Sequence, residues 1–149
     1  MVFELRDYQV DMIDRTRASL SKHQRVLLQA PTGAGKTALA CHMMSTAASR
    51  GLSSFFLVHQ NELLNQTSKA LWHNKLQHGI IASGRASTDA GVQLASIMTL
   101  RNRLQRYSQP SLIIIDEAHR ALAKTYQDIV SYFSGAKVVG LTATPQRTD

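Results

Sequence analysis

Two hydrophobic patterns alternate along the chain. Short runs of consecutive apolar residues occupy residues 25–29, 54–58, 79–82, 92–97, 111–115 and 137–141. Between most of these runs, apolar residues recur every three or four positions, as they do on one face of a helix. The helical stretches are residues 8–20, 36–50, 62–75, 100–107 and 122–133. Strands that alternate with helices at this spacing predict an α/β fold with a mostly parallel sheet and right-handed crossovers.

The same spacing predicts which side chains face the core. Gly51 is expected to end the second helix. Residues 83–90 are small and polar, which is typical of a loop, and Pro110 is expected to end the helical segment before the next strand. The run 111–115 is apolar on both faces, which is typical of a strand covered by helices on both sides. The inward positions are Tyr8, Met12, Thr16 and Leu20; Leu39, Met43 and Ala47; Leu63, Leu64, Thr67 and Leu71; Leu100, Leu104 and Tyr107; and Leu122, Tyr126, Ile129, Val130 and Phe133.

Composition narrows the class of protein. The 149 residues suit one domain, and no apolar run approaches the roughly 18 residues of a membrane span. The net charge of +7 favours a polyanionic partner, nucleic acid first, although a merely basic surface would have the same charge. The single cysteine, Cys41, excludes a disulfide within this sequence and a cysteine-rich metal site. Its position in a predicted helix indicates a buried thiol and a reducing, cytoplasmic setting.

A glycine-containing loop follows the first predicted strand and leads into a helix. Its sequence, APTGAGKT at residues 30–37, allows backbone N–H groups to surround a triphosphate at a helix N-terminus. Lys36 can reach the β- and γ-phosphates, and the Thr37 hydroxyl can bind Mg²⁺. A strand–turn–helix connection without a ligand would not require this Lys-Thr pair. The candidate nucleotide-binding residues of the loop are Thr32, Gly33, Ala34, Gly35, Lys36 and Thr37.

A pair of carboxylates follows the apolar run 111–115. Asp116 is placed at the carboxyl end of a strand, where open α/β sheets bind ligands, and can hold Mg²⁺. Glu117 can orient and deprotonate an attacking water, and His119 can sense the γ-phosphate or bridge to another loop. The alternative role for Asp116 and Glu117 is helix capping.

The loop 30–37 and the run Asp116-Glu117-Ala118-His119 together resemble the first motor domain of superfamily 2 helicases and translocases, of the DEAH-box-like branch. Ala30 stands where the general phosphate-loop motif has glycine, and alanine is common there in this superfamily. The resemblance covers nearly all of residues 1–149 and implies a three-layer RecA-like P-loop NTPase domain that binds ATP.

Two further segments support this resemblance and receive roles from it. Residues 5–9 resemble the adenine-recognising element, with Gln9 on the adenine edge and Arg6 beside it; the alternative is ordinary helix-start chemistry. Residues 142–145 resemble the coupling motif, in which the Thr142 and Thr144 hydroxyls connect the γ-phosphate region to the nucleic-acid face. A simple Thr/Pro turn is the alternative for that segment.

Two segments resemble the motifs that contact nucleic acid. Residues 57–66 place Gln60 and Asn61 in the first of them, with Asn61 where family members often carry arginine. Residues 92–100 place Ser96 in the second, where threonine is usual and the hydroxyl is kept. Amide groups and backbone N–H groups can still bind phosphate oxygens. A strand end followed by a helix cap is the alternative interpretation of both segments.

The resemblance implies ATP and Mg²⁺ as cofactors and nucleic acid as a partner, with DNA favoured over RNA. It also implies a second RecA-like domain, in the same or another chain, that supplies arginine fingers. Residues 1–149 alone are therefore expected to hydrolyse ATP weakly or not at all. A duplex translocase of a restriction or repair complex, and a non-catalytic ATP-dependent switch, remain alternatives to an unwinding helicase.

Overall fold

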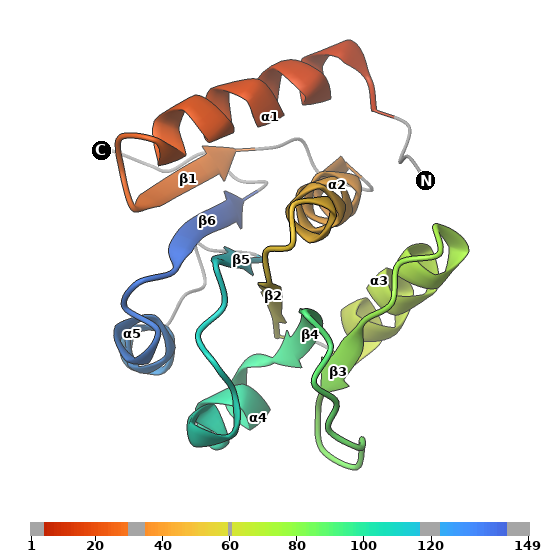
Figure 1. Ribbon diagram of the computed structural model, residues 1–149, viewed down its shortest axis with the longest axis vertical. Coiled ribbons are helices and arrows are strands. Elements are labelled where there is room, and N and C mark those ends of the chain that lie inside the picture. The colour runs from red at the N-terminus through yellow and green to blue at the C-terminus, as the bar shows by residue number, and fades with distance from the viewer. Residues whose placement is uncertain (1–4, 30–34, 60, 117–122, 143–149) are drawn as a thin grey trace.

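The computed structural model of the chain describes residues 5–29, 35–59, 61–116 and 123–142. A six-stranded sheet lies between two layers of helices, as Figure 1 shows. The strand order is β1-β6-β5-β2-β4-β3, and every neighbouring pair is parallel, which confirms the predicted mostly parallel α/β fold. The strands are β1 (Arg25–Gln29), β2 (Ser54–Val58), β3 (Gly79–Ile81), β4 (Val92–Ser96), β5 (Leu112–Ile115) and β6 (Lys137–Thr142).

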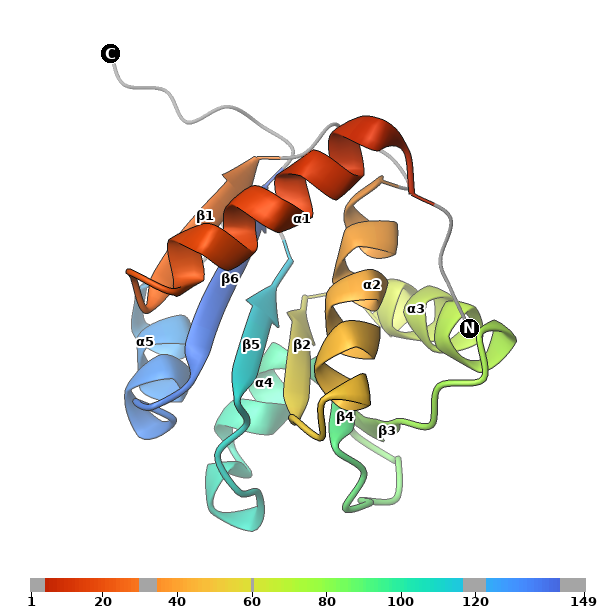
Figure 2. The same ribbon diagram turned by 45° about the horizontal axis from the view of Figure 1, so that its top comes forward.

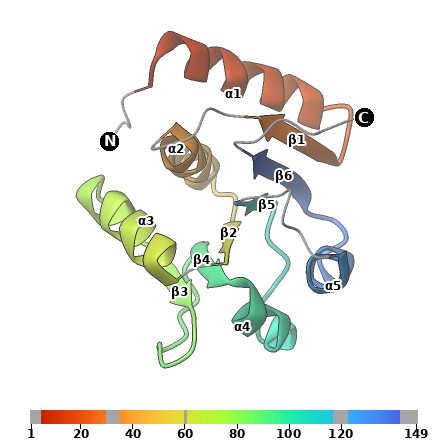
Figure 3. The same ribbon diagram turned by 180° about the vertical axis from the view of Figure 1, so that it is seen from behind.

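Helices cover both faces of the sheet. One layer consists of α1, α2 and α3, and the opposite layer consists of α4 and α5; Figure 3 shows the arrangement from behind. The helices are α1 (Asp7–Leu20), α2 (Gly35–Ser49), α3 (Asn61–His73), α4 (Ile97–Arg101) and α5 (Ala123–Tyr132), with a 3₁₀ turn η1 (Leu104–Arg106) after α4. None of the helices in the described part of the chain is both long enough and apolar enough to cross a membrane.

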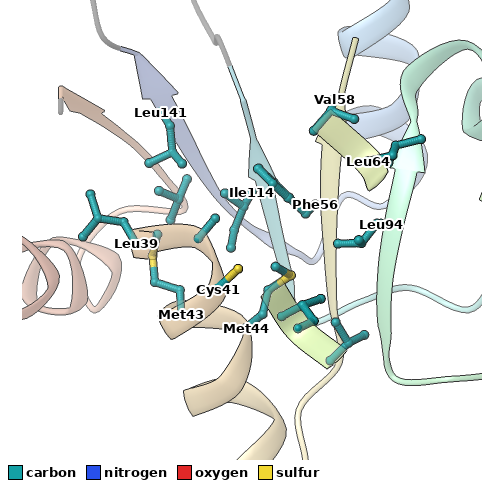
Figure 4. Packing of buried hydrophobic residues seen from close by; sticks show 14 of the residues in the cluster. Leu39, Cys41, Met43, Met44, Phe56, Val58, Leu64, Leu94, Ile114 and Leu141 are labelled. Atoms are coloured by element: carbon teal, nitrogen blue, oxygen red, sulfur yellow. The ribbon is translucent and has the colours of Figure 1, made fainter. Parts of the chain in front are cut away.

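The apolar strands supply both cores because successive side chains point to opposite faces. On β2, Phe56 and Val58 pack beneath α2 and α3 in the first core. Phe55 and Leu57 pack against α4 and α5 in the second core. Figure 4 shows the first core, in which the side chains of α2, among them Leu39, lie against the sheet. A strand buried on both faces therefore explains the continuous apolar runs seen in the sequence.

Gly51 ends α2 as the sequence predicted. Its φ of 74° lies in the left-handed region that glycine adopts without steric cost. The Gly51 N–H donates to the Ala48 carbonyl at 3.0 Å, and the Leu52 N–H donates to the Ala47 carbonyl at 2.9 Å. This pair of bonds is a Schellman motif, which satisfies carbonyls at the end of α2 and turns the chain toward β2.

The predicted inward face of α1 is partly wrong. Tyr8 is 41% exposed, and the buried residues are Gln9, Ile13 and Thr16. A strict spacing of four residues advances about 400° around the helix axis, so a stripe through residues 8, 12, 16 and 20 drifts away from the core. Alternate steps of four and three residues keep the buried stripe facing α2.

The helix predicted for residues 100–107 is interrupted. α4 ends at Arg101, and Arg103 leaves the helical region with φ −130° and ψ 20° before the 3₁₀ turn η1 begins. Leu100 is nevertheless fully buried, and Leu104 and Tyr107 pack against the second core. The spacing predicted the contacts correctly because a 3₁₀ turn also brings side chains three residues apart onto one face.

The carboxyl ends of the parallel strands gather at one end of the sheet. α2, the helix after β1, lies on one face of the sheet, whereas α5, the helix after β5, lies on the other, as Figure 2 shows. In open α/β sheets, ligands usually bind beyond the strand ends where consecutive elements diverge in this way, and this region is called the crevice below.

Candidate functional site

An ion pair joins the start of α2 to the end of β5. Lys36, in the first turn of α2, places its Nζ 3.5 Å from Oδ1 of Asp116, and both side chains are largely buried, at 12% and 8% exposure. The Asp116 N–H donates to the Leu57 carbonyl at 3.0 Å, which fixes the backbone at the strand end. Two residues that are 80 positions apart thus meet in the crevice, where the sequence predicted phosphate and metal binding.

Thr37 and Thr142 lie in the same region of the fold. Thr37 is half-buried in the first turn of α2, one residue after Lys36. Thr142 is the last residue of β6, is 1% exposed, and pairs in register with Gln29 at the end of β1. Thr142 is far from α2 in sequence, but in space β6 lies between β1, the strand before α2, and β5, the strand before Asp116.

The segment before the phosphate loop reaches the N-terminus of α2. The Nε2 of Gln9 lies 3.4 Å from the Gly35 carbonyl oxygen, a long contact for a hydrogen bond. A Cβ atom added to Gly35 would lie 3.4 Å from this Nε2, so the side chain closely approaches the first residue of α2. Gln9 therefore lies beside Gly35, the first residue of the predicted phosphate loop that the structure describes.

Gln9 also performs the helix-start chemistry that was its alternative role. Its Oε1 accepts from the Arg6 N–H at 2.9 Å, and its own N–H donates to the Arg6 carbonyl at 2.9 Å. Gln9 is 5% exposed, whereas Arg6 is exposed at the start of α1. Contact of either residue with adenine stays a prediction.

The two predicted nucleic-acid segments meet at neighbouring strand ends. Val58 and Ser96, the last residues of β2 and β4, are paired in register. Asn61 is exposed at the start of α3, and Ser96 is half-buried just before α4. Ser96 makes no side-chain cap bond to α4, so the alternative role of helix capping is not what its hydroxyl does in this structure.

Two contacts in this region were not foreseen from the sequence. The Arg85 Nη2 donates to Oδ1 of Asn65 at 2.8 Å, which brings the loop after β3 to the first turns of α3. The hydroxyl of Tyr126 on α5 lies 2.9 Å from Nε2 of His59, which directly follows β2. Tyr126 was predicted only as a core residue; the phenolic oxygen on a buried helix face was the signal of a polar partner.

Several predicted site residues lie outside the described residues. They are Thr32, Gly33, Ala34, Gln60, Glu117, His119 and Thr144. Among the residues that the structure describes, no three or more His, Cys, Asp or Glu side chains group together as metal ligands. The carboxylate of Asp116 and the hydroxyl of Thr37 are oxygen donors of the kind that a hard cation prefers.

The burial of Cys41 agrees with its predicted structural role. The side chain is fully buried on α2, and burial raises the pKa of its thiol to about 12 from the ordinary 9.0. A thiol with this pKa is neutral at physiological pH and is therefore not a nucleophile.

Comparison with known proteins identifies the family. The model of the family described as "Type III restriction enzyme, res subunit" matches residues 2–147. The chain belongs to this family. Among curated relatives of the res-subunit domain, the "Putative ATP-dependent helicase IRC3" of Saccharomyces cerevisiae is 33% identical over 97% of the chain and 24% of its own length. The "DNA 3'-5' translocase XPB2" of Sulfurisphaera tokodaii is 31% identical over 98% of the chain and 32% of its own length.

Solved structures show the same fold for this res-subunit domain. The UvsW helicase of bacteriophage T4 superposes with a TM-score of 0.79 at 21% identity, over 95% of the chain and 53% of that protein. The family match, the IRC3 relative and this shared fold together confirm the predicted resemblance to the first RecA-like domain of superfamily 2 helicases. The chain spans about a quarter to a third of the two curated relatives described above.

Proposed function

We propose that the chain is the ATP-binding half of a motor that couples ATP hydrolysis to movement on nucleic acid. The observation that carries this proposal is the buried Lys36–Asp116 pair, which joins the phosphate-binding helix α2 to the strand end that precedes Glu117. Family membership and the helicase relatives support the same function. The proposal extends to the complete protein, of which these residues form one wall of the ATP site.

The residues of the crevice fit magnesium ATP. Lys36 presents a point charge suited to the β- and γ-phosphates, at the N-terminus of a helix whose dipole favours anions. The hydroxyl of Thr37 and the carboxylate of Asp116 are oxygen donors of the kind that Mg²⁺ prefers. The loop residues Thr32, Gly33, Ala34 and Gly35 would add backbone N–H groups, and Gln9 with Arg6 would bind the adenine.

Each residue of the crevice then has a chemical task. Magnesium ATP supplies the phosphoanhydride bond whose hydrolysis drives the motor. Glu117 orients the attacking water and accepts its proton, while Lys36 stabilises the charge that develops on the phosphate oxygens. His119 senses the γ-phosphate, and Thr142 and Thr144 pass that state to the nucleic-acid side of the sheet.

The nucleic-acid side is the part of the sheet end formed by β2, β4 and β3. Gln60, Asn61 and Ser96 would bind sugar–phosphate groups there, because a motor must step along any sequence. DNA is favoured over RNA, and the XPB2 relative, which is named as a DNA translocase, supports this choice. The net charge of +7 favours the same class of partner.

A second RecA-like domain, in the same chain or in a partner, completes the site in this proposal. It would supply the arginine fingers, which contribute about 10³–10⁵ in rate in related nucleotide hydrolases. Residues 1–149 alone would then bind ATP but hydrolyse it weakly or not at all. We place the complete protein in the cytoplasm, where ATP and nucleic acid are both available.

Translocation along duplex DNA without unwinding is a second candidate function. The family description and a relative named as an endonuclease subunit of a type I restriction enzyme favour it, since both belong to restriction systems. A strand-displacement assay and a duplex-translocation assay on the complete protein distinguish the two. Strand displacement supports the helicase, and triplex displacement without strand separation supports the translocase.

Replacement of Lys36 tests the nucleotide site directly. Hydrogen bonds to charged groups contribute about 1.5–3 kcal/mol each, so Lys36→Ala should weaken ATP binding by roughly 10- to 150-fold. Isothermal titration calorimetry on residues 1–149 measures the affinity, and circular dichroism confirms that the variant is folded. Lys22→Ala, an exposed lysine at the end of α1, is the matched control and should bind ATP as the parent does. Equal affinity for ATP in the Lys36→Ala variant and the parent would exclude the proposed phosphate site.

A further inference from the structure

Helix α5 contacts the segment that follows β2. The Tyr126 hydroxyl lies 2.9 Å from Nε2 of His59, and the two rings meet edge to face with centroids 5.6 Å apart. Tyr126 is 3% exposed, so its ring is anchored in the second core while its oxygen reaches the sheet end. His59 directly follows Val58 and stands two positions before Asn61, at the start of the first predicted nucleic-acid segment.

The same helix contacts the element that follows β4. Asp128 accepts from Nε of Arg101 at 2.9 Å, and Lys124 Nζ lies 3.3 Å from its other oxygen. The hydrogen bond from Arg101 is the main cause that lowers the pKa of Asp128 below its ordinary value, so this carboxylate stays charged at neutral pH. Arg101 is the last residue of α4, which begins directly after Ser96 in the second predicted nucleic-acid segment.

α5 shares the second core with β5, whose last residue, Ile115, directly precedes Asp116. It begins at Ala123, seven residues after Asp116. Ile129, Val130 and Phe133 bury it against the sheet at 0%, 6% and 1% exposure. Interiors packed in this way transmit small displacements as rigid units rather than absorbing them.

We infer that Tyr126 and Asp128 are positioning residues, through which α5 holds both nucleic-acid segments in a fixed relation to Asp116. The inference rests on the proposed function and adds a route between the two sides of the sheet. Packing alone would be served by phenylalanine at position 126, because its ring fills the same space. The hydroxyl is therefore assigned to the bond with His59, and Asp128 to the bond with Arg101.

The test measures coupling and not only activity. The complete protein is assayed for ATP turnover without nucleic acid, with saturating single-stranded DNA and with saturating duplex DNA, and its dissociation constant for each DNA is measured separately. Tyr126→Phe should leave basal turnover within about twofold of the parent. It should lower the stimulation by saturating DNA at least fivefold, which corresponds to about 1 kcal/mol. Asp128→Asn should lower the stimulation in the same direction.

Tyr132→Phe is the matched control, since Tyr132 is on the same helix and 49% exposed. Its stimulation should equal that of the parent. Thermal unfolding of each variant shows whether a loss of stimulation merely follows from misfolding. Parental stimulation in a folded Tyr126→Phe variant overturns the inference and leaves the proposed function intact. A parent protein that no nucleic acid stimulates overturns the proposed function and the inference with it.

A double-mutant cycle assigns the effect to the pair. If the hydroxyl acts through His59, adding His59→Ala to the Tyr126→Phe variant should change the stimulation by no more than about twofold further. Fully additive losses from the two substitutions would show that Tyr126 and His59 act independently, which contradicts the proposed positioning role.

Discussion

At the scale of single residues, contacts that follow from the order of parallel strands could be predicted from the sequence. Contacts that depend on where a helix lies over the sheet could not. Lys36 and Asp116 each follow a strand, and strand ends of a parallel sheet gather at one end, so their proximity follows from topology. The bond between His59 and Tyr126 joins residues whose sequence positions do not indicate contact. It depends on the position of α5 over the sheet, which hydrophobic spacing alone does not specify.

Cys41 gives a prediction at this scale. Burial raises the pKa of its thiol to about 12, so at pH 8 roughly one thiol in 10⁴ is ionised, against about one in ten for a thiol with the ordinary value of 9.0. We expect iodoacetamide to alkylate Cys41 at least about 1,000-fold faster in denatured protein than in folded protein. Mass spectrometry of timed samples at pH 8, with and without urea, measures both rates. Rapid alkylation of the folded chain would contradict the burial of this side chain.

At the scale of elements, the sequence predicted which segments form helices and strands more readily than it predicted which face of a helix is buried. The strands were predictable because a sheet covered on both faces requires continuous apolar runs. The rotation of α1 was not, because Tyr8 and Gln9 differ by only about 100° around the helix and tertiary contacts with α2 decide between them. The interruption after α4 was also missed, since a 3₁₀ turn preserves the spacing of Leu100, Leu104 and Tyr107.

The end of α2 gives a prediction at this scale. Gly51 has φ 74°, and a Cβ atom there would meet nothing within 4 Å, so Gly51→Ala introduces backbone strain without a clash. We expect a loss of about 1–2 kcal/mol in the free energy of unfolding. Gly91→Ala is the control, because its added Cβ also meets nothing within 4 Å and its backbone is not left-handed. Urea denaturation should show Gly91→Ala close to the parent, and equal stability of both variants would contradict the left-handed Gly51.

At the scale of the whole molecule, the carboxyl end of the sheet has two sides. The ends of β1, β6 and β5 carry the residues proposed for ATP, and the ends of β2, β4 and β3 carry those proposed for nucleic acid. The boundary runs between β5 and β2, where the Asp116 N–H donates to Leu57 and where α5 reaches His59. In the proposed motor, coupling would run from Asp116 to the nucleic-acid side across this strand pair and through α5.

The central claim is that this chain forms one wall of an ATP site whose hydrolysis responds to nucleic acid. The most direct test is the steady-state ATP turnover of the complete protein with and without DNA, for the parent and for Glu117→Gln. The account predicts that DNA raises the turnover of the parent and that Glu117→Gln abolishes it while ATP still binds. ATP binding without any turnover that nucleic acid stimulates, or full turnover in Glu117→Gln, would contradict the account.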